Sequence, residues 1–127
     1  MNAEIRPASI APPAANYALA MLTEAPTRWL HTAGIVPVTP DGTVPDELTD
    51  QARTVWANIA ALLDDAGMSA TDIVSFTTYV VAGAQLDDVM AARDEFMAGH
   101  RAASTLVTVP ALARPEWRLE IGVIAAT

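Results

Sequence analysis

The clearest alternation of apolar and polar residues lies near the C-terminal end of the chain, in residues Trp117–Ala125. One face of this run carries Leu119, Ile121, Val123 and Ala125, and the other carries Arg118, Glu120, Gly122 and Ile124. The pattern predicts a strand inside a sheet. A charge removed from water must be compensated, so Glu120 is a candidate functional residue. The alternative is a glutamate on an edge strand that faces water.

Five runs of β-branched and apolar residues predict strands, namely Tyr17–Leu22, Trp29–Gly34, Ile73–Val81, Ser104–Val109 and Trp117–Ala125. A turn at Glu24–Thr27 separates the first two, which we therefore expect to form a hairpin. Three prolines and an Asp-Gly pair predict a loop over Val36–Pro45, and Pro110–Glu116 connects the last two strands. Residues 1–15 are rich in Pro and Ala and predict an extended lead-in.

Apolar residues at three- and four-residue steps predict two helices. The first covers Glu47–Ala66, and Gly67 follows it where a terminating glycine belongs. The second covers Gln85–Ala98, with Gly99 as its stop.

The element order ββαβαββ predicts an α+β fold, a mixed β-sheet with two helices on one face. At 127 residues the chain predicts one domain, residues 1–127. The Ile73–Val81 run is apolar on both faces, yet two helices cover only one. We therefore expect another copy of the chain to cover the second face.

The amino-acid composition excludes several kinds of catalytic and binding site. The chain has no Cys, and all seven basic residues are Arg, which excludes thiolate nucleophiles and Schiff-base lysines. His31 and His100 lack helical ligand spacing, so we expect no metal site. The net charge of −8 argues against nucleic acid as a partner. No apolar run has membrane-spanning length, and the start lacks the pattern of a secretory signal, so we expect a cytoplasmic protein without a membrane partner.

Four motifs, in order along the chain, resemble the RidA-like (YjgF-like) reactive-intermediate deaminase family. Ala11-Pro12 followed by Tyr17 is similar to the family's opening, and Thr32 to Pro37 resembles its Ser-Gly-Gln-Ile-Pro strand end. Residues Gln51–Ser69 resemble its first helix and are the most specific piece. Residues Leu119–Ala125 resemble its Glu-Ile-x-x-Ile-Ala strand. The resemblance covers Ala11 to Ala125.

The resemblance implies a chorismate-mutase-like fold, a homotrimer and clefts between subunits. In active members of the family these clefts bind small imines or enamines that carry a carboxylate. An Arg in a Pro-Ala-Arg-Ser motif holds the carboxylate, and a glutamate positions the water that hydrolyses the imine. No cofactor is required. On this resemblance Glu120 is the water-positioning residue, and Tyr17 lines the pocket.

The chain departs from the family pattern at three polar positions. Its motif reads Arg101-Ala102-Ala103-Ser104, so Ala103 stands at the position of the carboxylate-binding Arg. Ala33 and Ile35 replace the Ser and Gln of the second strand. Because a charged hydrogen bond contributes about 1.5–3 kcal/mol, losing the Arg weakens such a ligand about 10- to 150-fold. The usual 2-imino acid deaminase activity is therefore not expected.

The candidate substrate-binding residues are Tyr17, Ala33, Arg101, Ala103 and Ser104. Tyr17 could simply pack on the sheet, and Arg101 could be a surface or interface cation. Ser104 could donate its hydroxyl to a ligand, although no triad partner stands near it. Arg114 and Arg118 are further candidates to replace the missing arginine. For Glu120 the alternative is a structural ion pair with Arg118.

Two hypotheses about function follow. The first is a cofactor-free enzyme of the RidA-like superfamily, a hydrolase or proton-transfer catalyst that acts on an imine, enamine or related unsaturated intermediate. The second is a non-catalytic trimer that binds a small molecule or a partner. A Glu120 that faces solvent and pairs with Arg118 would favour the second hypothesis.

Overall fold

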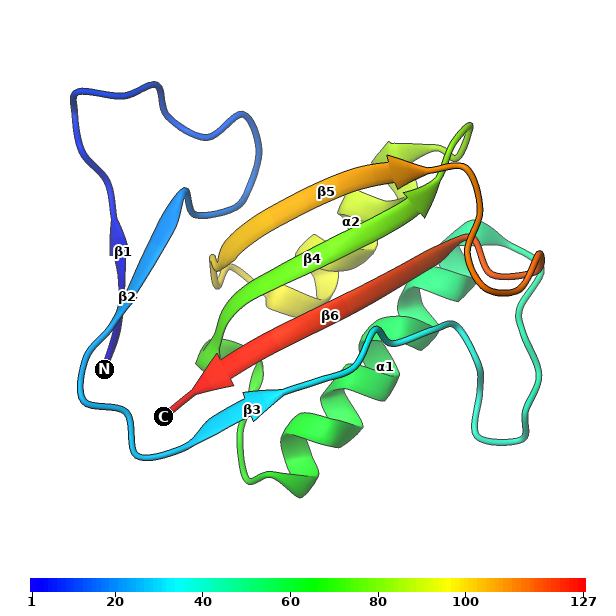
Figure 1. The fold of residues 1–127 in the computed structure, drawn as a ribbon, viewed down its shortest axis with the longest axis horizontal. Helices are drawn as coiled ribbons and strands as arrows, with labels where there is room; N and C mark the ends of the chain where they lie inside the picture. The colour runs from blue at the N-terminus through cyan, green and yellow to red at the C-terminus, as the bar shows by residue number, and fades with distance from the viewer.

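The computed structural model describes all 127 residues and shows the predicted α+β fold, with two helices packed on one face of a mixed sheet (Figure 1). Its elements, in chain order, are β1 Asn2–Ile5, β2 Ala20–Thr23, β3 Trp29–His31, α1 Leu48–Asp65, the 3₁₀ turn η1 Ala70–Asp72, β4 Ile73–Val81, α2 Leu86–Met97, β5 Ala103–Val109 and β6 Leu119–Ala126. From β2 onward the order is the predicted ββαβαββ.

The main sheet has the strand order β3-β6-β4-β5. Strands β4 and β5 are parallel and are joined by α2, whereas β6 pairs antiparallel with both β3 and β4. Strand β6 therefore lies inside the sheet, as its alternation predicts. Residues Leu119, Ile121, Val123 and Ala125 are buried toward the helices, which leaves Glu120, Gly122 and Ile124 on the opposite face.

The hairpin predicted between the Tyr17–Leu22 and Trp29–Gly34 runs, which correspond to β2 and β3, is wrong. Strand β2 pairs with β1, and β3 pairs with β6. The segment between them directs the chain away from β2, because the backbone N–H groups of Thr27 and Arg28 both donate to the carbonyl oxygen of Thr127 at the end of β6. Within the extended lead-in predicted for residues 1–15, Asn2–Ile5 form an additional strand, β1, which the sequence analysis did not predict.

Helix α1 buries one stripe of its surface on the sheet, consisting of Leu48, Gln51, Ala52, Val55, Trp56, Ile59 and Leu63. The Trp56 ring stacks on Phe96 of α2, with ring centroids 4.7 Å apart, and meets the Phe76 ring of β4 edge-on at 5.4 Å. These contacts join both helices to the sheet. Leu62, which the helical periodicity places with the buried stripe, is instead 40% exposed.

The two helices end differently. Gly67 follows α1 with a left-handed φ of +69°, as the sequence predicts. Helix α2 ends one residue earlier than its predicted stop, because Ala98 already adopts a φ of +47°. Alanine lacks the conformational freedom of glycine in this region, so the end of α2 carries local backbone strain.

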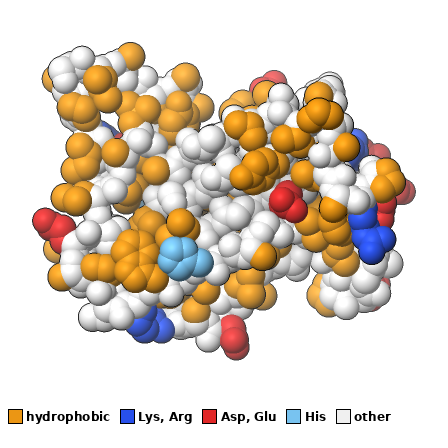
Figure 2. All heavy atoms as spheres, in the orientation of Figure 1, with side chains coloured by type: hydrophobic (Ala, Val, Ile, Leu, Met, Phe, Trp, Pro, Cys, Tyr) orange, Lys and Arg blue, Asp and Glu red, His pale blue; other side chains and the backbone are white.

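No helix covers the sheet face that carries Glu120, and Figure 2 looks onto that face. Hydrophobic side chains gather toward its two ends, and the middle is formed mainly by other side chains and backbone (Figure 2). Trp29 is 50% exposed, Val107 39% and Tyr79 37%. None of the helices combines the length and apolar character needed to cross a membrane.

Candidate functional site

Glu120 projects from the uncovered face of the sheet, on β6, directly opposite Tyr79 of β4. Its side chain is half-buried and lies against the backbone of Gly34. A Cβ atom on Gly34 would lie only 2.6 Å from Cδ of Glu120 and 2.7 Å from its Oε2. The carboxyl group therefore occupies space that is available only because residue 34 is a glycine.

The segment before Gly34 is fixed to β6 by a threonine side chain. The backbone N–H of Thr32 donates to the Val123 carbonyl at 3.0 Å, and the N–H of Val123 donates to Oγ1 of Thr32 at 2.9 Å. Beyond it, the N–H of Ile35 donates to the Ile121 carbonyl at 2.8 Å. These bonds carry the pairing past the end of β3 and keep Gly34 beside Glu120.

Glu120 borders a shallow hollow of about 370 Å³ on the sheet surface. The polar groups around it are the His31 ring, the Tyr79 hydroxyl and the hydroxyls of Thr32, Ser75 and Thr77. No arginine lines the hollow, and the Glu120 carboxylate makes no ion pair. The hollow thus combines one carboxylate with the His31 ring and several hydroxyl groups.

The alternative ion pair between Glu120 and Arg118 is not present. The Arg118 guanidinium donates instead to the Asp46 carbonyl, and the backbone N–H of Arg118 donates to Oε1 of Gln51 at 3.0 Å. Arg114 lies over the Trp117 ring, 5.7 Å from its centroid. Neither arginine reaches the Glu120 hollow.

Gln51 is a buried polar residue that the sequence analysis did not single out. Its Nε2 donates to the carbonyls of Pro45 and Glu116, at 2.8 and 2.9 Å, while its Oε1 accepts from Arg118. It therefore joins the end of the 36–45 loop to the start of β6. A glutamine inside an otherwise apolar helical stripe was the signal that could have identified it.

Tyr17, Arg101 and Ala103 lie together at the start of β5. Nη2 of Arg101 donates to the Tyr17 carbonyl at 2.6 Å and to Oε1 of Glu4 at 3.0 Å. Ala103 pairs with Ser75 of β4, whereas Glu120 pairs with Tyr79, four residues further along the same strand. Four residues span about 13 Å, so one subunit does not bring this cluster to Glu120.

The remaining two predicted residues are divided between the faces of the sheet. Ala33 is exposed and adjoins Gly34 beside the Glu120 hollow. Ser104 is the β5 partner of the buried Phe76 and lies on the helix-facing side, near Trp56 and Met90. Ser104 therefore does not share a face with Ala103 or Glu120. No group of three or more His, Asp or Glu side chains is close enough to hold a metal ion.

Comparison with protein families and curated sequences gives consistent matches. The family model described as Endoribonuclease L-PSP matches residues 8–127. The Escherichia coli K12 protein named putative reactive intermediate deaminase TdcF is 30% identical over 99 residues, which is 76% of this chain and 77% of that protein. A RutC family protein of Haemophilus influenzae is 38% identical over 66 residues, 51% of this chain and about half, 48%, of that protein.

Solved structures show the same similarity over almost the whole chain. YyfB from Yersinia pestis, described as a protein of unknown function of the conserved Rid family, aligns with a TM-score of 0.89 and 30% identity, covering 99% of this chain and 98% of YyfB. E. coli TdcF with bound serine aligns with a TM-score of 0.74 and 26% identity, covering 93% and 90% of the two chains.

Proposed function

Because this chain belongs to the RidA/YjgF-like family, whose model is described as Endoribonuclease L-PSP, we propose that it is a cofactor-free enzyme that hydrolyses a small imine or enamine at the Glu120 hollow. One observation carries the proposal: a half-buried carboxylate without a counter-ion lies in a hollow of the uncovered sheet face. The name of TdcF, a putative reactive intermediate deaminase, supports the reaction class.

In the proposed reaction Glu120 acts on water and on the substrate nitrogen. The water oxygen bonds to the carbon of a protonated imine, and Glu120 accepts one water proton, which leaves a neutral carbinolamine. Glu120 then returns that proton to the nitrogen. The C–N bond breaks, the hydroxyl proton passes to the departing ammonia, and the products are a carbonyl compound and ammonium. Neighbouring hydroxyls such as those of Thr77 and Tyr79 would orient the substrate.

The negative charge of Glu120 should determine which imines bind in the hollow. A carboxylate without a counter-ion attracts a cationic iminium group and repels a second carboxylate. Within one subunit no arginine offers a site for the acid group of a 2-imino acid. We therefore expect imines without a carboxylate to be the better substrates.

We further propose that the working unit is a homotrimer, the arrangement that the family resemblance implies. The uncovered face exposes Trp29, Tyr79 and Val107, and a second copy packed there would shield these side chains from water. It could also bring a neighbour's Tyr17, Arg101 and Ala103 toward Glu120. Light scattering should give the mass of three 13.4 kDa chains, and the mass of a single chain would contradict this part of the proposal.

Two coupled assays test the reaction. An amine oxidase supplies imines without a carboxylate, an amino-acid oxidase supplies 2-imino acids, and the rate of carbonyl formation is compared with spontaneous hydrolysis. We expect faster turnover of the first group. Glu120→Gln should abolish both activities and leave the trimer intact. Ala103→Arg should improve binding of 2-oxo acids about 10- to 150-fold. Robust wild-type turnover of 2-imino acids would refute the substrate preference.

The loss of polar side chains at Ala33, Ile35 and Ala103 supports a second candidate, a non-catalytic trimer that binds a small molecule. This candidate would be favoured if wild type and Glu120→Gln were equally inactive on every imine tested. We propose that RNA is not a ligand, despite the family description, because the net charge is −8. A salt-sensitive shift of labelled RNA at micromolar protein would contradict this.

A further inference from the structure

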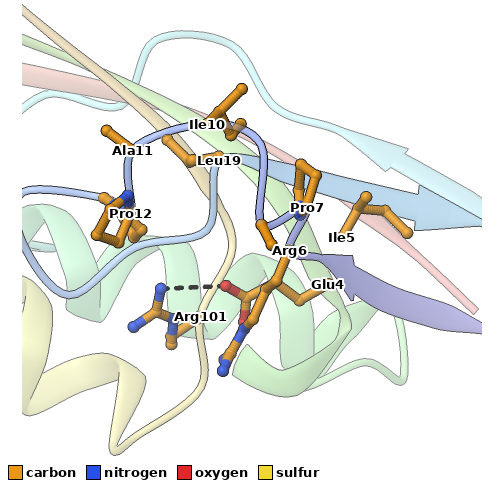
Figure 3. A pocket seen from close by; sticks show the side chains of 11 residues that line it. Glu4, Ile5, Arg6, Pro7, Ile10, Ala11, Pro12, Leu19 and Arg101 are labelled. Carbon is orange, nitrogen blue, oxygen red and sulfur yellow. Dashed lines mark hydrogen bonds and ion pairs between the residues drawn. The ribbon is translucent and has the colours of Figure 1, made fainter.

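A cavity of about 450 Å³ lies between the N-terminal segment and the start of β5, away from the Glu120 hollow. Its walls are largely apolar and come mainly from Ile5, Ile10, Leu19 and three prolines, Pro7, Pro12 and Pro13. Figure 3 shows Ile10 and Leu19 on one side of the cavity, and Glu4, Arg6 and Arg101 on the other. An apolar chamber with charged groups gathered at one side is typical of sites for small amphiphilic ligands.

The charged side of this cavity holds two guanidinium groups and one carboxylate. Oε2 of Glu4 pairs with Nη2 of Arg6 at 2.5 Å, and its Oε1 pairs with Nη2 of Arg101 at 3.0 Å. A single carboxylate is thus divided between two cations, and one positive charge is left without a partner. The side chains of Glu4 and Arg101 are only 15% and 26% exposed, so solvent screens this charge incompletely.

The hydrogen bonds of Arg101 are also incomplete. Its Nη2 donates to both Glu4 and the Tyr17 carbonyl, while its Nε is buried and has no acceptor. Glu4 therefore contacts Arg101 through one oxygen and one nitrogen only. A carboxylate can accept two parallel bonds from an arginine, and that arrangement is stronger than a single contact.

We propose that this cavity is a binding site for a small monocarboxylate with a compact apolar body. The ligand carboxylate would take the place of Glu4 on Arg101 and accept from both Nη2 and Nε. Glu4 would remain paired with Arg6, so that every charge has a partner. The apolar body of the ligand would lie against Ile5, Ile10 and Leu19. The site does not rest on the reaction proposed for Glu120, because an imine without a carboxylate needs no contact with Arg101.

At neutral pH the Glu4 carboxylate competes with the ligand carboxylate for Arg101. The hydrogen bond from Arg6, followed by the hydrogen bond and charge of Arg101, holds the pKa of the Glu4 carboxyl below its usual value, so the group is ionised. The proposal therefore makes opposite predictions for the two residues beside Arg101. Removing the charge of Glu4 should strengthen ligand binding, and removing the charge of Arg6 should weaken it.

Calorimetric titration of the full chain with 4-methylpentanoate tests the site, with 4-methylpentanamide as the uncharged control. We expect Glu4→Gln to bind the acid about tenfold or more tightly than wild type, because the competing carboxylate is gone. Arg6→Gln should bind it several-fold more weakly, since Glu4 is then left to Arg101 alone. Arg101→Gln should lose binding, whereas Arg114→Gln, a change at an exposed arginine outside the cavity, should not.

Several outcomes would overturn the proposal. They are equal affinity for the amide and the acid, weaker binding by Glu4→Gln, or unchanged binding by Arg101→Gln. If Arg101→Gln does not fold, the opposite effects expected for Glu4→Gln and Arg6→Gln still decide the question. Because Glu120→Gln should abolish imine turnover without changing the affinity for 4-methylpentanoate, failure of this site and failure of the proposed reaction are distinguishable.

Discussion

The contact between Gly34 and Glu120 allows the proposed role of Glu120 to be tested without changing the carboxylate itself. In Gly34→Ala the new methyl group would lie 2.6 Å from Cδ of Glu120, whereas ordinary contacts begin at 3.4 Å. The carboxyl group therefore has to retreat by about 0.8 Å, the difference between these two distances. A displacement of this size at a reacting group costs up to about a hundredfold in rate.

The same substitution should have little effect on folding. Gly34 is exposed and does not have a left-handed φ, so alanine fits its backbone. The atoms that must move belong to a flexible side chain, and an unfavourable rotamer costs about 0.5–1.5 kcal/mol. We therefore expect turnover to fall by about one to two orders of magnitude, while the free energy of unfolding decreases by no more than about 1.5 kcal/mol.

Gly122→Ala is the matched control, because Gly122 lies on the same strand and face as Glu120. A Cβ atom there would meet only the Ala33 carbonyl oxygen, at an ordinary 3.8 Å. Imine hydrolysis by wild type, Gly34→Ala, Gly122→Ala and Glu120→Gln should be compared in the oxidase-coupled assays, with urea unfolding in parallel. Wild-type turnover by Gly34→Ala, or an equal loss in both alanine variants, would refute the reasoning.

Three further predictions concern stability. Gln51→Ala should lower the free energy of unfolding by about 1–3 kcal/mol, because it removes three part-buried hydrogen bonds to the backbone, whereas the exposed Gln85→Ala should change it little in urea titrations. Ala98→Gly should raise the unfolding free energy by about 0.5–1 kcal/mol by relieving the positive φ, and a lower melting temperature would contradict this. The Glu4 pKa is lowered in the folded state, so its ion pairs stabilise β1 above the ordinary pKa and are lost as pH falls through the lowered one. Hydrogen exchange of the β1 amides should therefore accelerate, relative to its intrinsic rate, as the pH falls below the ordinary carboxyl pKa of 4.5, and Glu4→Gln should remove this dependence.

Periodicity predicted those parts of the fold that depend on one buried face. The alternation of Trp117–Ala125 identified the buried side of β6 and placed Glu120 opposite to it. The spacing of apolar residues located both helices to within a residue or two, and Gly67 marked the end of the first. The same alternation also separates Ser104 from Ala103, because adjacent residues of a strand point to opposite faces. Only one of these two residues can therefore face Glu120.

Strand partners and charge pairs depended on contacts between distant parts of the chain. The hairpin expected at Glu24–Thr27 fails because Thr27 bonds to Thr127, 100 residues away. No local pattern reveals that Glu4 reaches Arg101, 97 residues away, or that the backbone of Gly34 makes room for Glu120. Strand β1 has only four residues and is followed by a proline-rich segment. It is therefore too short to show a sustained alternation that would predict a strand.

The distribution of positive charge is what limits the chemistry of the Glu120 hollow. Each of the seven arginines has a contact elsewhere: Arg6 and Arg101 with Glu4, Arg53 with Glu95, Arg93 with Asp94, Arg28 with the Ala66 carbonyl, Arg118 with the Asp46 carbonyl and Arg114 with the Trp117 ring. The chain contains no lysine, so one subunit supplies neither an arginine nor a lysine to the hollow. An anionic substrate would therefore need an arginine from a second copy, and Arg101 would first have to release Glu4. A neutral or cationic imine needs neither step, and for this reason we propose it as the preferred substrate.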